Sequence, residues 1–295
     1  MNKLSPRRRI GQAGLALLGV LFGVTSTTSL ARCPNPTEVM EVAAAYVNKT
    51  PAAHITAIKN LQDAYCAQGM IAAEIGRSMG VMVGYKAAFT SAHMQRAFGA
   101  DAPQRGYLYE KMFLKNGATV PSGFGALPQV GADLLLIVKD YRIHDAQTAL
   151  EVLQHISYVV PFIELSDLIW ADTQPVTHVQ LVAANMGTRL GVLGTPIPVQ
   201  ASQEFLDGLA SMTIVMHDEE GVELGRAQGK DVLGNPVFAV QWLAQDLARN
   251  GQRIQMDDRI AIGAFFPGHV PATGKTFTVR YQGLPGDPSV AVKFK

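Results

Sequence analysis

The spacing of apolar residues changes at Val81, and this change limits the fold more than any other feature of the sequence. Before it, apolar residues recur every three or four positions, which predicts helices over Glu38–Val47 and Pro51–Met79. Thr50-Pro51 would begin the second helix as a cap followed by a first-turn proline. After Val81, short runs rich in β-branched and aromatic residues alternate with turn residues, which is typical of strands.

The predicted strands are Val81–Ala87, Ala132–Val138, Phe162–Leu165, Val192–Leu193, Met212–His217, Arg259–Ile262, Thr276–Tyr281 and Val290–Phe294. Helical patterns interrupt them at Ala146–Ser157 and Pro236–Asn250. We therefore predict an α+β fold, with a helical N-terminal cap over residues 32–80 and a mixed, mostly β body over residues 81–295.

The composition excludes several classes of protein. Of the 295 residues, 48% are hydrophobic and 17% are charged, which argues against disorder and allows a sizeable core. The formal net charge of +1 gives no basic footprint for nucleic acid, so we expect no nucleic-acid partner. Walker-type phosphate loops and the G-x-G-x-x-G and H-E-x-x-H motifs are missing from the sequence.

The first 31 residues have the layout of an export signal. They hold four basic residues and no acidic one, and the apolar run Ile10–Val24 leads to small residues at Ser29-Leu30-Ala31. We expect a signal peptide over residues 1–31, a periplasmic or secreted mature chain, and no membrane contact after cleavage. Arg7-Arg8-Arg9-Ile10 also resembles a twin-arginine signal. An uncleaved anchor is the alternative, although the run is shorter than the roughly 20 residues that span a bilayer.

The chain has two cysteines, Cys33 and Cys66. In an oxidising compartment an even pair favours a disulfide, which would tie the mature N-terminus to a helix. Two isolated buried thiols are the alternative, because the sequence does not fix the distance between them.

Several segments carry a collinear resemblance to a known family over residues 60–294. They are Asp63-Ala64-Tyr65-Cys66-Ala67-Gln68, Gly84-Tyr85-Lys86-Ala87-Ala88-Phe89-Thr90-Ser91, Val160-Pro161-Phe162-Ile163-Glu164-Leu165-Ser166-Asp167 and Val232-Leu233-Gly234-Asn235-Pro236. In these runs the chain resembles the 2-keto-4-pentenoate hydratase / oxalocrotonate decarboxylase branch of the fumarylacetoacetate hydrolase superfamily. The resemblance implies the mixed β-roll body of the fumarylacetoacetase C-terminal domain, and commonly a homo-oligomer.

The resemblance also implies a chemistry. Members bind Mg²⁺ or Mn²⁺ through three carboxylates and act on small 2-oxo acids or their dienol forms. A hard cation can chelate the carboxylate and 2-oxo oxygens of such a substrate and stabilise an enolate. On the matching positions, Lys86 is the catalytic lysine, Asp133 and Glu164 are metal ligands, and Thr90, Ser91 and Asn235 bind substrate.

Three positions depart from the family pattern. Gly131 stands where the family has a third carboxylate ligand, and a glycine has no side chain with which to ligate. Gln104 is neutral where the family has an acid, and Ala264 lacks the hydroxyl that the family places in the pocket wall.

These departures leave three hypotheses open. The first is an exported hydratase-like lyase with an incomplete metal site. The second is a degraded member that binds a small carboxylate without turnover, where Lys86 and Arg105 would supply positive charge. The third is related chemistry on another substrate, such as decarboxylation or C–C hydrolysis.

Overall fold

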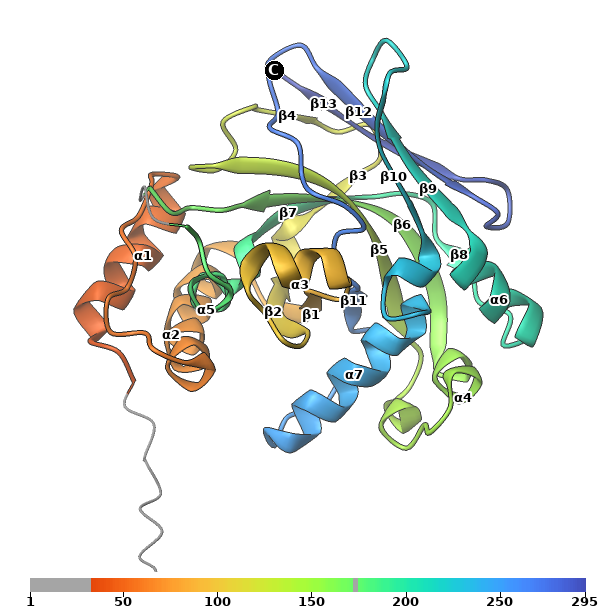
Figure 1. Cartoon of the computed structure of the whole chain (residues 1–295), viewed down its shortest axis with the longest axis horizontal. Helices are drawn as coiled ribbons and strands as arrows, with labels where there is room; N and C mark the ends of the chain where they lie inside the picture. The colour runs from red at the N-terminus through yellow and green to blue at the C-terminus, as the bar shows by residue number, and fades with distance from the viewer. Residues whose placement is uncertain (1–32, 172–174) are drawn as a thin grey trace, which may run out of the picture. The chain divides into compact units, whose positions relative to one another are not determined.

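A large mixed β-sheet carries two of the four matched runs, Gly84–Ala88 on one strand and Val160–Asp167 on another (Figure 1). The structure is a computed structural model that describes residues 33–171 and 175–295, so the predicted signal peptide lies outside the described residues. The strands follow the order β2 (Gln104–Tyr109), β1 (Met82–Ala88), β11 (Arg259–Ala261), β5 (Pro128–Val138), β6 (Ile156–Asp167), β7 (Thr188–Leu193) and β3 (Phe113–Lys115), and β8 (Ile197–Pro198) pairs with β6.

The antiparallel pair β5 and β6 forms the centre of this sheet. Its register sets Gly131 opposite Glu164 and Asp133 opposite Phe162. Both strands are nearly continuous apolar runs, as expected of strands that are covered on both faces. The acidic side chains of Asp133 and Glu164 interrupt these runs, and both lie on the same face of the sheet because side chains alternate along a strand.

A second sheet covers the opposite face. Its order is β10 (Glu223–Gln228), β9 (Thr213–His217), β12 (Thr276–Gln282), β13 (Ser289–Phe294) and β4 (Thr119–Val120). Val279 of β12 packs in one core with Leu134 and Ile163 of the large sheet. Helices α4 (Ala149–Gln154), α6 (Gln203–Ser211) and α7 (Pro236–Arg249) contribute to the same core.

Helices cover the other face of the large sheet, which we call the site face because it carries Lys86, Asp133 and Glu164. They are α1 (Pro36–Asn48), α2 (Leu61–Met79), α3 (Ala92–Phe98) and α5 (His178–Ala183) (Figure 1). Their apolar residues form a second core with Leu135, Val160 and Phe162 of the sheet. This arrangement confirms the predicted α+β class.

One predicted helix is wrong over its first ten residues. Pro51–Met79 is helical only from Leu61, where Asn60 caps the helix by accepting a 3.0 Å hydrogen bond from the amide of Asp63. Upstream, the amide of Ala52 donates to the carbonyl of Ile169 (2.8 Å), and the carbonyl of Ala52 accepts from the amide of Ala171 (2.9 Å). These residues therefore form an extended segment that pairs with the chain just after β6. This tertiary pairing overrides the helix propensity of the segment.

Other predicted elements differ mainly at their ends. The predicted helix Ala146–Ser157 is shorter, at Ala149–Gln154, because β6 begins at Ile156. The predicted strands all lie within or overlap observed strands, whereas β2, β10, α3, α5 and α6 were not expected.

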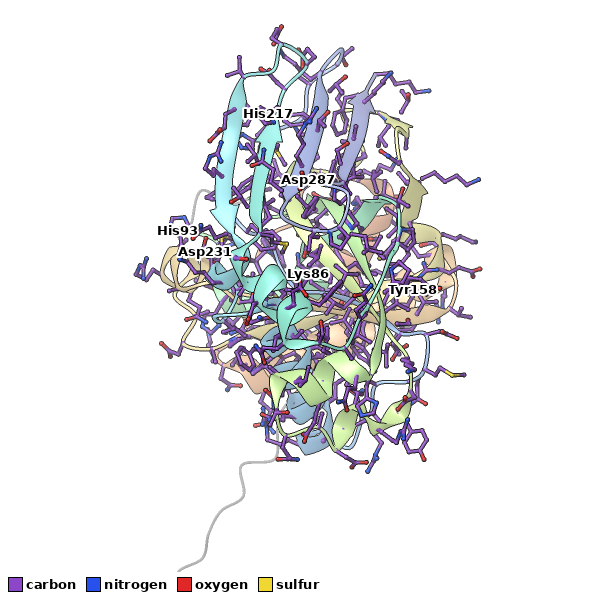
Figure 2. The ribbon with its side chains drawn as sticks, turned by 90° about the vertical axis from the view of Figure 1, so that its right-hand side faces the viewer. Lys86, His93, Tyr158, His217, Asp231 and Asp287 are labelled. Atoms are coloured by element: carbon purple, nitrogen blue, oxygen red, sulfur yellow. A yellow bond between two sulfur atoms is a disulfide. The ribbon has the colours of Figure 1, made fainter. Side chains whose placement is uncertain are left out.

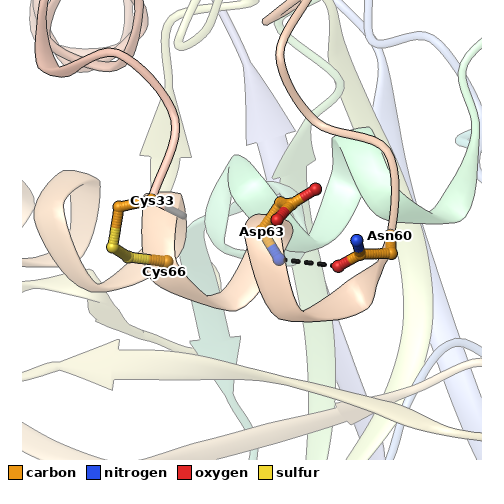
Figure 3. Close-up of a disulfide and its surroundings, with 4 residues drawn as sticks. All are labelled: Cys33, Asn60, Asp63 and Cys66. Carbon is orange, nitrogen blue, oxygen red and sulfur yellow. Dashed lines mark hydrogen bonds between the residues drawn. A yellow bond between two sulfur atoms is a disulfide. The ribbon is translucent and has the colours of Figure 1, made fainter. Parts of the chain in front are cut away.

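Cys33 and Cys66 form a disulfide, as predicted (Figure 3). Their Cα atoms lie 5.4 Å apart, and the bond joins the first described residue to α2. The described residues form one compact unit, and the boundary at residue 80 between cap and body stays a prediction. No helix among the described residues is long and apolar enough to span a membrane.

Candidate active site

Lys86 lies in the middle of β1 and is buried in the interior of the molecule (Figure 2). Its Nζ donates to Oε1 of Glu164 in an ion pair, and lies 3.2 Å from the carbonyl oxygen of Met186. Gly84 allows this position, since a Cβ there would lie 2.0 Å from the carbonyl oxygen of Arg259 on the adjacent strand. Gly84 therefore allows β11 to approach β1 closely, two residues before the lysine.

Glu164 lies between two glycines on the neighbouring strands. Gly131 of β5 and Gly191 of β7 both stand opposite it in the register. A Cβ at Gly191 would lie 2.1 Å from the ring of Phe162, so packing requires a glycine there. A Cβ at Gly131 would meet only the Cβ of Ala264, at 3.7 Å, so this glycine leaves open space beside the carboxylate.

Asp133 is fully buried and has one oxygen without a partner. Its Oδ1 accepts hydrogen bonds from the amides of Leu134 (2.6 Å) and Ile262 (3.2 Å). Its Oδ2 has no hydrogen-bond partner among the described residues. Burial raises the pKa of Asp133 above the usual range, and the negative charge of Glu164 adds to this rise while Lys86 opposes it.

Tyr281 ties this part of the sheet to the second sheet. From β12, its hydroxyl hydrogen bonds to the carbonyl oxygens of Asp133 and Phe162 and accepts a 3.1 Å bond from the amide of Phe162. Burial raises the pKa of this hydroxyl, which keeps it protonated. The backbone at Asp133 and Phe162 is therefore fixed by a side chain of the second sheet.

A pocket of about 300 Å³ opens over Lys86 and Glu164. Four polar side chains line it: Lys86, Gln129, Glu164 and Ser166. Glycines contribute backbone at 131 and 268, and the other lining residues are apolar: Ala88, Phe89, Met94, Ala97, Phe98, Leu168, Leu181, Met186, Ala264 and Pro267.

The residues predicted to bind substrate lie outside this lining. Thr90 donates its hydroxyl to the carbonyl of Ile262 (2.7 Å), and Ser91 caps α3 through the amide of Met94 (3.3 Å). Asn235 caps α7 by accepting from the amide of Val237 (3.2 Å). Each has a backbone partner, and their role in substrate binding stays a prediction.

The other singled-out positions divide between the pocket and its surroundings. Ala264 lines the pocket. Gln104 is not part of the lining, and its Nε2 lies 2.6 Å from Nδ1 of His178. Arg105 forms a buried ion pair with Asp246 and stacks over the ring of Tyr65 at 4.3 Å. Arg105 is therefore engaged away from the pocket and does not supply its charge.

Sequence reasoning missed Gln129 and Ser166. Ser166 follows Glu164 by two residues, so the alternation of side chains along a strand places it on the same face. Gln129 stands directly opposite Ser166 on β5. The alternation of side chains along β6 could have predicted that Ser166 lies on the same face as Glu164. Gln129 could not be predicted in this way, because its position depends on which residues of β5 and β6 pair.

Asp133 and Glu164 are the carboxylates of the site that could hold a divalent cation. The described residues include no group of three or more His, Cys, Asp or Glu side chains arranged to hold a metal ion. Asp133 and Glu164 are nonetheless diagonal neighbours on adjacent strands, a relation in which residues are roughly 7–8 Å apart and their Cβ atoms somewhat closer. The unpartnered Oδ2 of Asp133 is a buried oxygen that a cation would satisfy. The residues thus fit an ion that is held by two carboxylates and completed by water or substrate, as Mg²⁺ often is.

No family model matches the chain, but comparison with known proteins finds relatives among hydratases and decarboxylases. The chain is 31% identical over 204 residues to 2-keto-4-pentenoate hydratase 1 of Dechloromonas aromatica (strain RCB), covering 69% of this chain and 75% of the relative. It is 28% identical over 233 residues to 4-oxalocrotonate decarboxylase of Pseudomonas putida, covering 79% and 84%.

Solved structures show the same fold. The 4-oxalocrotonate decarboxylase of Pseudomonas putida G7, complexed with magnesium and adipate, superposes with a TM-score of 0.76 at 24% identity and covers 90% of this chain and 100% of that one. A fumarylpyruvate hydrolase from Pseudomonas aeruginosa, in complex with Mn²⁺ and pyruvate, gives 0.54 at 14% identity over 72% and 89%. The fold expected from the resemblance is thus confirmed. The chain belongs to the 2-keto-4-pentenoate hydratase / 4-oxalocrotonate decarboxylase family.

Proposed function

We propose that this protein is a hydratase-like lyase that acts on a small 2-oxo acid with the help of Mg²⁺ or Mn²⁺. The observation that carries the proposal is the pairing of Lys86 with Glu164 on the floor of an apolar pocket, beside the buried Asp133. Asp133 and Glu164 would hold the cation. When bound, it would supply Lewis-acid stabilisation of the negative charge that develops on the 2-oxo group.

Residues of the chain itself would move the proton, orient the catalytic amine and exclude water. Nζ of Lys86 is placed to hold or move the proton that travels between carbon and oxygen of the substrate. Glu164 and the carbonyl of Met186 orient that amine. The apolar lining limits the access of water to the reacting atoms, and this strengthens each charge interaction in the pocket.

The direct test is turnover of 2-hydroxypenta-2,4-dienoate with and without Mg²⁺ or Mn²⁺. Lys86→Ala and Glu164→Ala should each lower kcat/KM by about a hundredfold or more, because general acid–base groups contribute on that scale. Lys230→Ala is the matched control, since Lys230 is exposed on a 3₁₀ turn outside the pocket. Turnover no higher than in the two pocket variants would refute the proposal.

A second function is favoured by Gly131 and Gln104. With a ligand position lost and an acid replaced by a neutral amide, the pocket could bind a small carboxylate without converting it. This alternative predicts that a 2-oxo acid binds equally well with and without a chelator, and that no product forms. Binding that requires the cation would instead favour the lyase.

We further propose that the protein works outside the cytoplasm. The Cys33–Cys66 disulfide supports this, because disulfides persist in oxidising compartments, and the signal-like first 31 residues agree with it. Expression of the full chain in a bacterium followed by cell fractionation provides the test. The protein should reach the periplasm or medium lacking its first 31 residues, and an intact chain in the cytoplasm would contradict the proposal.

A further inference from the structure

A second pocket, of about 500 Å³, lies on the site face beyond the candidate active site. We call it the Arg259 pocket. It is lined by strand residues of the large sheet and by the turns that follow β3 and β7: Phe113, Leu114, Lys115, Asn116, Leu135, Ile137, Val160, Leu193, Gly194, Thr195, Pro196 and Arg259. None of these described lining residues belongs to a helix, so the sheet meets the pocket directly.

Phe162 separates this pocket from the one over Lys86. Side chains alternate along β6, so Val160, Phe162 and Glu164 follow one another on the site face. Val160 lines the Arg259 pocket and Glu164 lines the other, and the two pockets share no lining residue. The ring of Phe162 packs against that of Phe113, with 6.1 Å between the centroids. The Arg259 pocket is therefore a separate cavity.

The floor of the Arg259 pocket is apolar. Leu135, Val160 and Leu193 come from the three adjacent strands β5, β6 and β7, and Ile137 extends the floor along β5. Leu135 and Val160 are buried, whereas Ile137 and Leu193 are half-buried. A ligand with an apolar body would remove the accessible part of this floor from water, which favours binding in proportion to the area covered.

Two cations, Arg259 and Lys115, line the pocket, and none of its described lining residues is acidic. The guanidinium carbon of Arg259 lies 4.5 Å from the centroid of the Phe113 ring, and this stacking orients the planar group. Within the described part of the chain, neither cationic group has an ion pair or a hydrogen bond. By contrast, the buried Arg105 and Arg189 each pair with a carboxylate. The donors of Arg259 and Lys115 thus remain available to an anion.

We propose that the Arg259 pocket is a second ligand site, which binds a small organic carboxylate with an apolar body. The guanidinium of Arg259 presents paired N–H donors that match the two oxygens of a carboxylate, and Lys115 adds a second positive charge. The apolar body would lie on Leu135 and Val160. Inorganic phosphate would leave this floor in contact with water, and a neutral ligand would cover Arg259 without giving it a counter-charge.

The size of the Arg259 pocket agrees with such a ligand. Its volume of about 500 Å³ lies within the roughly 300–1,000 Å³ that is usual for small-molecule sites. Octanoate is a suitable probe, because it joins a carboxylate to a flexible alkyl chain. Octanamide has the same chain and a neutral head group, so it isolates the contribution of the charge.

Calorimetric titration of octanoate into the protein tests the proposal. A chelator is included, because a divalent cation would draw carboxylates to the pocket over Lys86. Arg259→Gln should weaken octanoate binding by about tenfold or more, since it removes a charge-assisted, bidentate contact. Arg253→Gln is the matched control: it removes the same charge from an exposed residue outside the pocket, and binding should not change.

Octanamide should bind the wild-type protein about tenfold more weakly than octanoate does. This comparison needs no substitution, so it does not depend on how well Arg259→Gln folds. Failure of octanoate to bind, equal binding of octanoate and octanamide, or equal binding of octanoate to the wild type and to Arg259→Gln would each overturn the proposal.

Crystals grown with 8-bromooctanoate would locate the ligand. We expect the anomalous signal of bromine beside Leu135 and Val160, with the carboxylate within hydrogen-bond distance of Arg259. A bromine peak only in the pocket over Lys86 would overturn the proposal. A second copy of this chain is the other possible occupant, and sedimentation of the wild type and of Arg259→Gln tests for it. An oligomer that this substitution dissociates would overturn the proposal by assigning the pocket to a subunit interface.

Discussion

The ion pair between Lys86 and Glu164 is the residue-scale feature on which the site depends. Both side chains are about 8% exposed, so each would be costly to bury alone. Asp133 lies on β5, next to the strand that carries Glu164. Burial raises the pKa of Asp133, and this limits the combined negative charge of Asp133 and Glu164 in the absence of a cation.

Removing one partner of this pair should destabilise the protein more than removing both. Glu164→Gln leaves a buried ammonium without its counter-charge and should lower the free energy of unfolding by about 3 kcal/mol. Adding Lys86→Met should restore most of that loss. Urea denaturation at pH 7 without metal measures both, and a double variant no more stable than the single one would show that the pair is not coupled.

Gly131 gives the second prediction at this scale. A side chain at this position would meet only Ala264, so Gly131→Glu should fold and supply a third carboxylate beside Glu164. The affinity for Mn²⁺ should rise by about tenfold or more, because charged ligands tune such sites. Electron paramagnetic resonance titration of free Mn²⁺ measures the affinity, with Gly131→Gln as neutral control. Equal affinity in both variants would place the ion elsewhere.

The sequence allowed the charged residues of the candidate site to be predicted better than the apolar residues that line its pocket. Lys86 and Glu164 are charged residues inside apolar runs, so burial and pairing could be inferred for them before the fold was known. The wall residues Phe89, Met94 and Leu181 are apolar like the core, and only the packing of α3 and α5 separates them from it. Thr90 and Ser91 match a motif, yet their hydrogen bonds are made to the backbone.

At the scale of elements, the local pattern succeeded where a helix has one apolar face or a strand is a nearly continuous apolar run, as in β5 and β6. It failed over residues 51–60, where Ala52 is held by backbone bonds to Ile169 and Ala171, far away in sequence. It also missed β2, Gln104–Tyr109, whose Gln, Arg and Gly residues do not favour a strand and which exists because it pairs with β1. Such pairings cannot be inferred from a single segment.

The turn before β11 supplies a prediction about pH. Asp258 accepts a 2.7 Å bond from the amide of Gln255, and burial raises the pKa of its carboxyl group above the ordinary value of 3.8. A raised pKa means that folding penalises the ionised form, so this group lowers stability as pH rises from 3.8 through the folded pKa.

Asp258→Asn keeps an acceptor oxygen and removes the charge. The variant should be more stable than the wild type at pH 7 by about 1 kcal/mol or less, and the difference should vanish below about pH 4. Thermal unfolding followed by circular dichroism across this range measures it. A stabilisation that grows as the pH falls would contradict the sign of the shift.

At the scale of the whole molecule, the large sheet separates two cores. One face meets the second sheet and α7, and the other meets the N-terminal helices and carries the site. The Cys33–Cys66 bond fastens the start of the described chain to α2 on that second side (Figure 3). The homo-oligomer implied by the resemblance stays a prediction.

Loss of the disulfide should therefore destabilise the helical side of the molecule. Its sequence separation is 33 residues, for which chain entropy gives about 3–4 kcal/mol. Cys33→Ser/Cys66→Ser should lower the free energy of unfolding by up to that amount, and dithiothreitol should bring the wild type to the same value. A double variant as stable as the oxidised protein would show that the bond is dispensable.

We propose that two carboxylates and a lysine on the site face act together on a small 2-oxo acid with a bound cation. The decisive measurement is a crystal structure of the mature protein with Mn²⁺ and a small 2-oxo acid. We predict an anomalous-difference peak within about 2.5 Å of oxygens from both Asp133 and Glu164, with the acid in the pocket over Lys86. A pocket that holds the acid with no peak there, and with Lys86 still paired to Glu164, would show that these residues do not work through a cation.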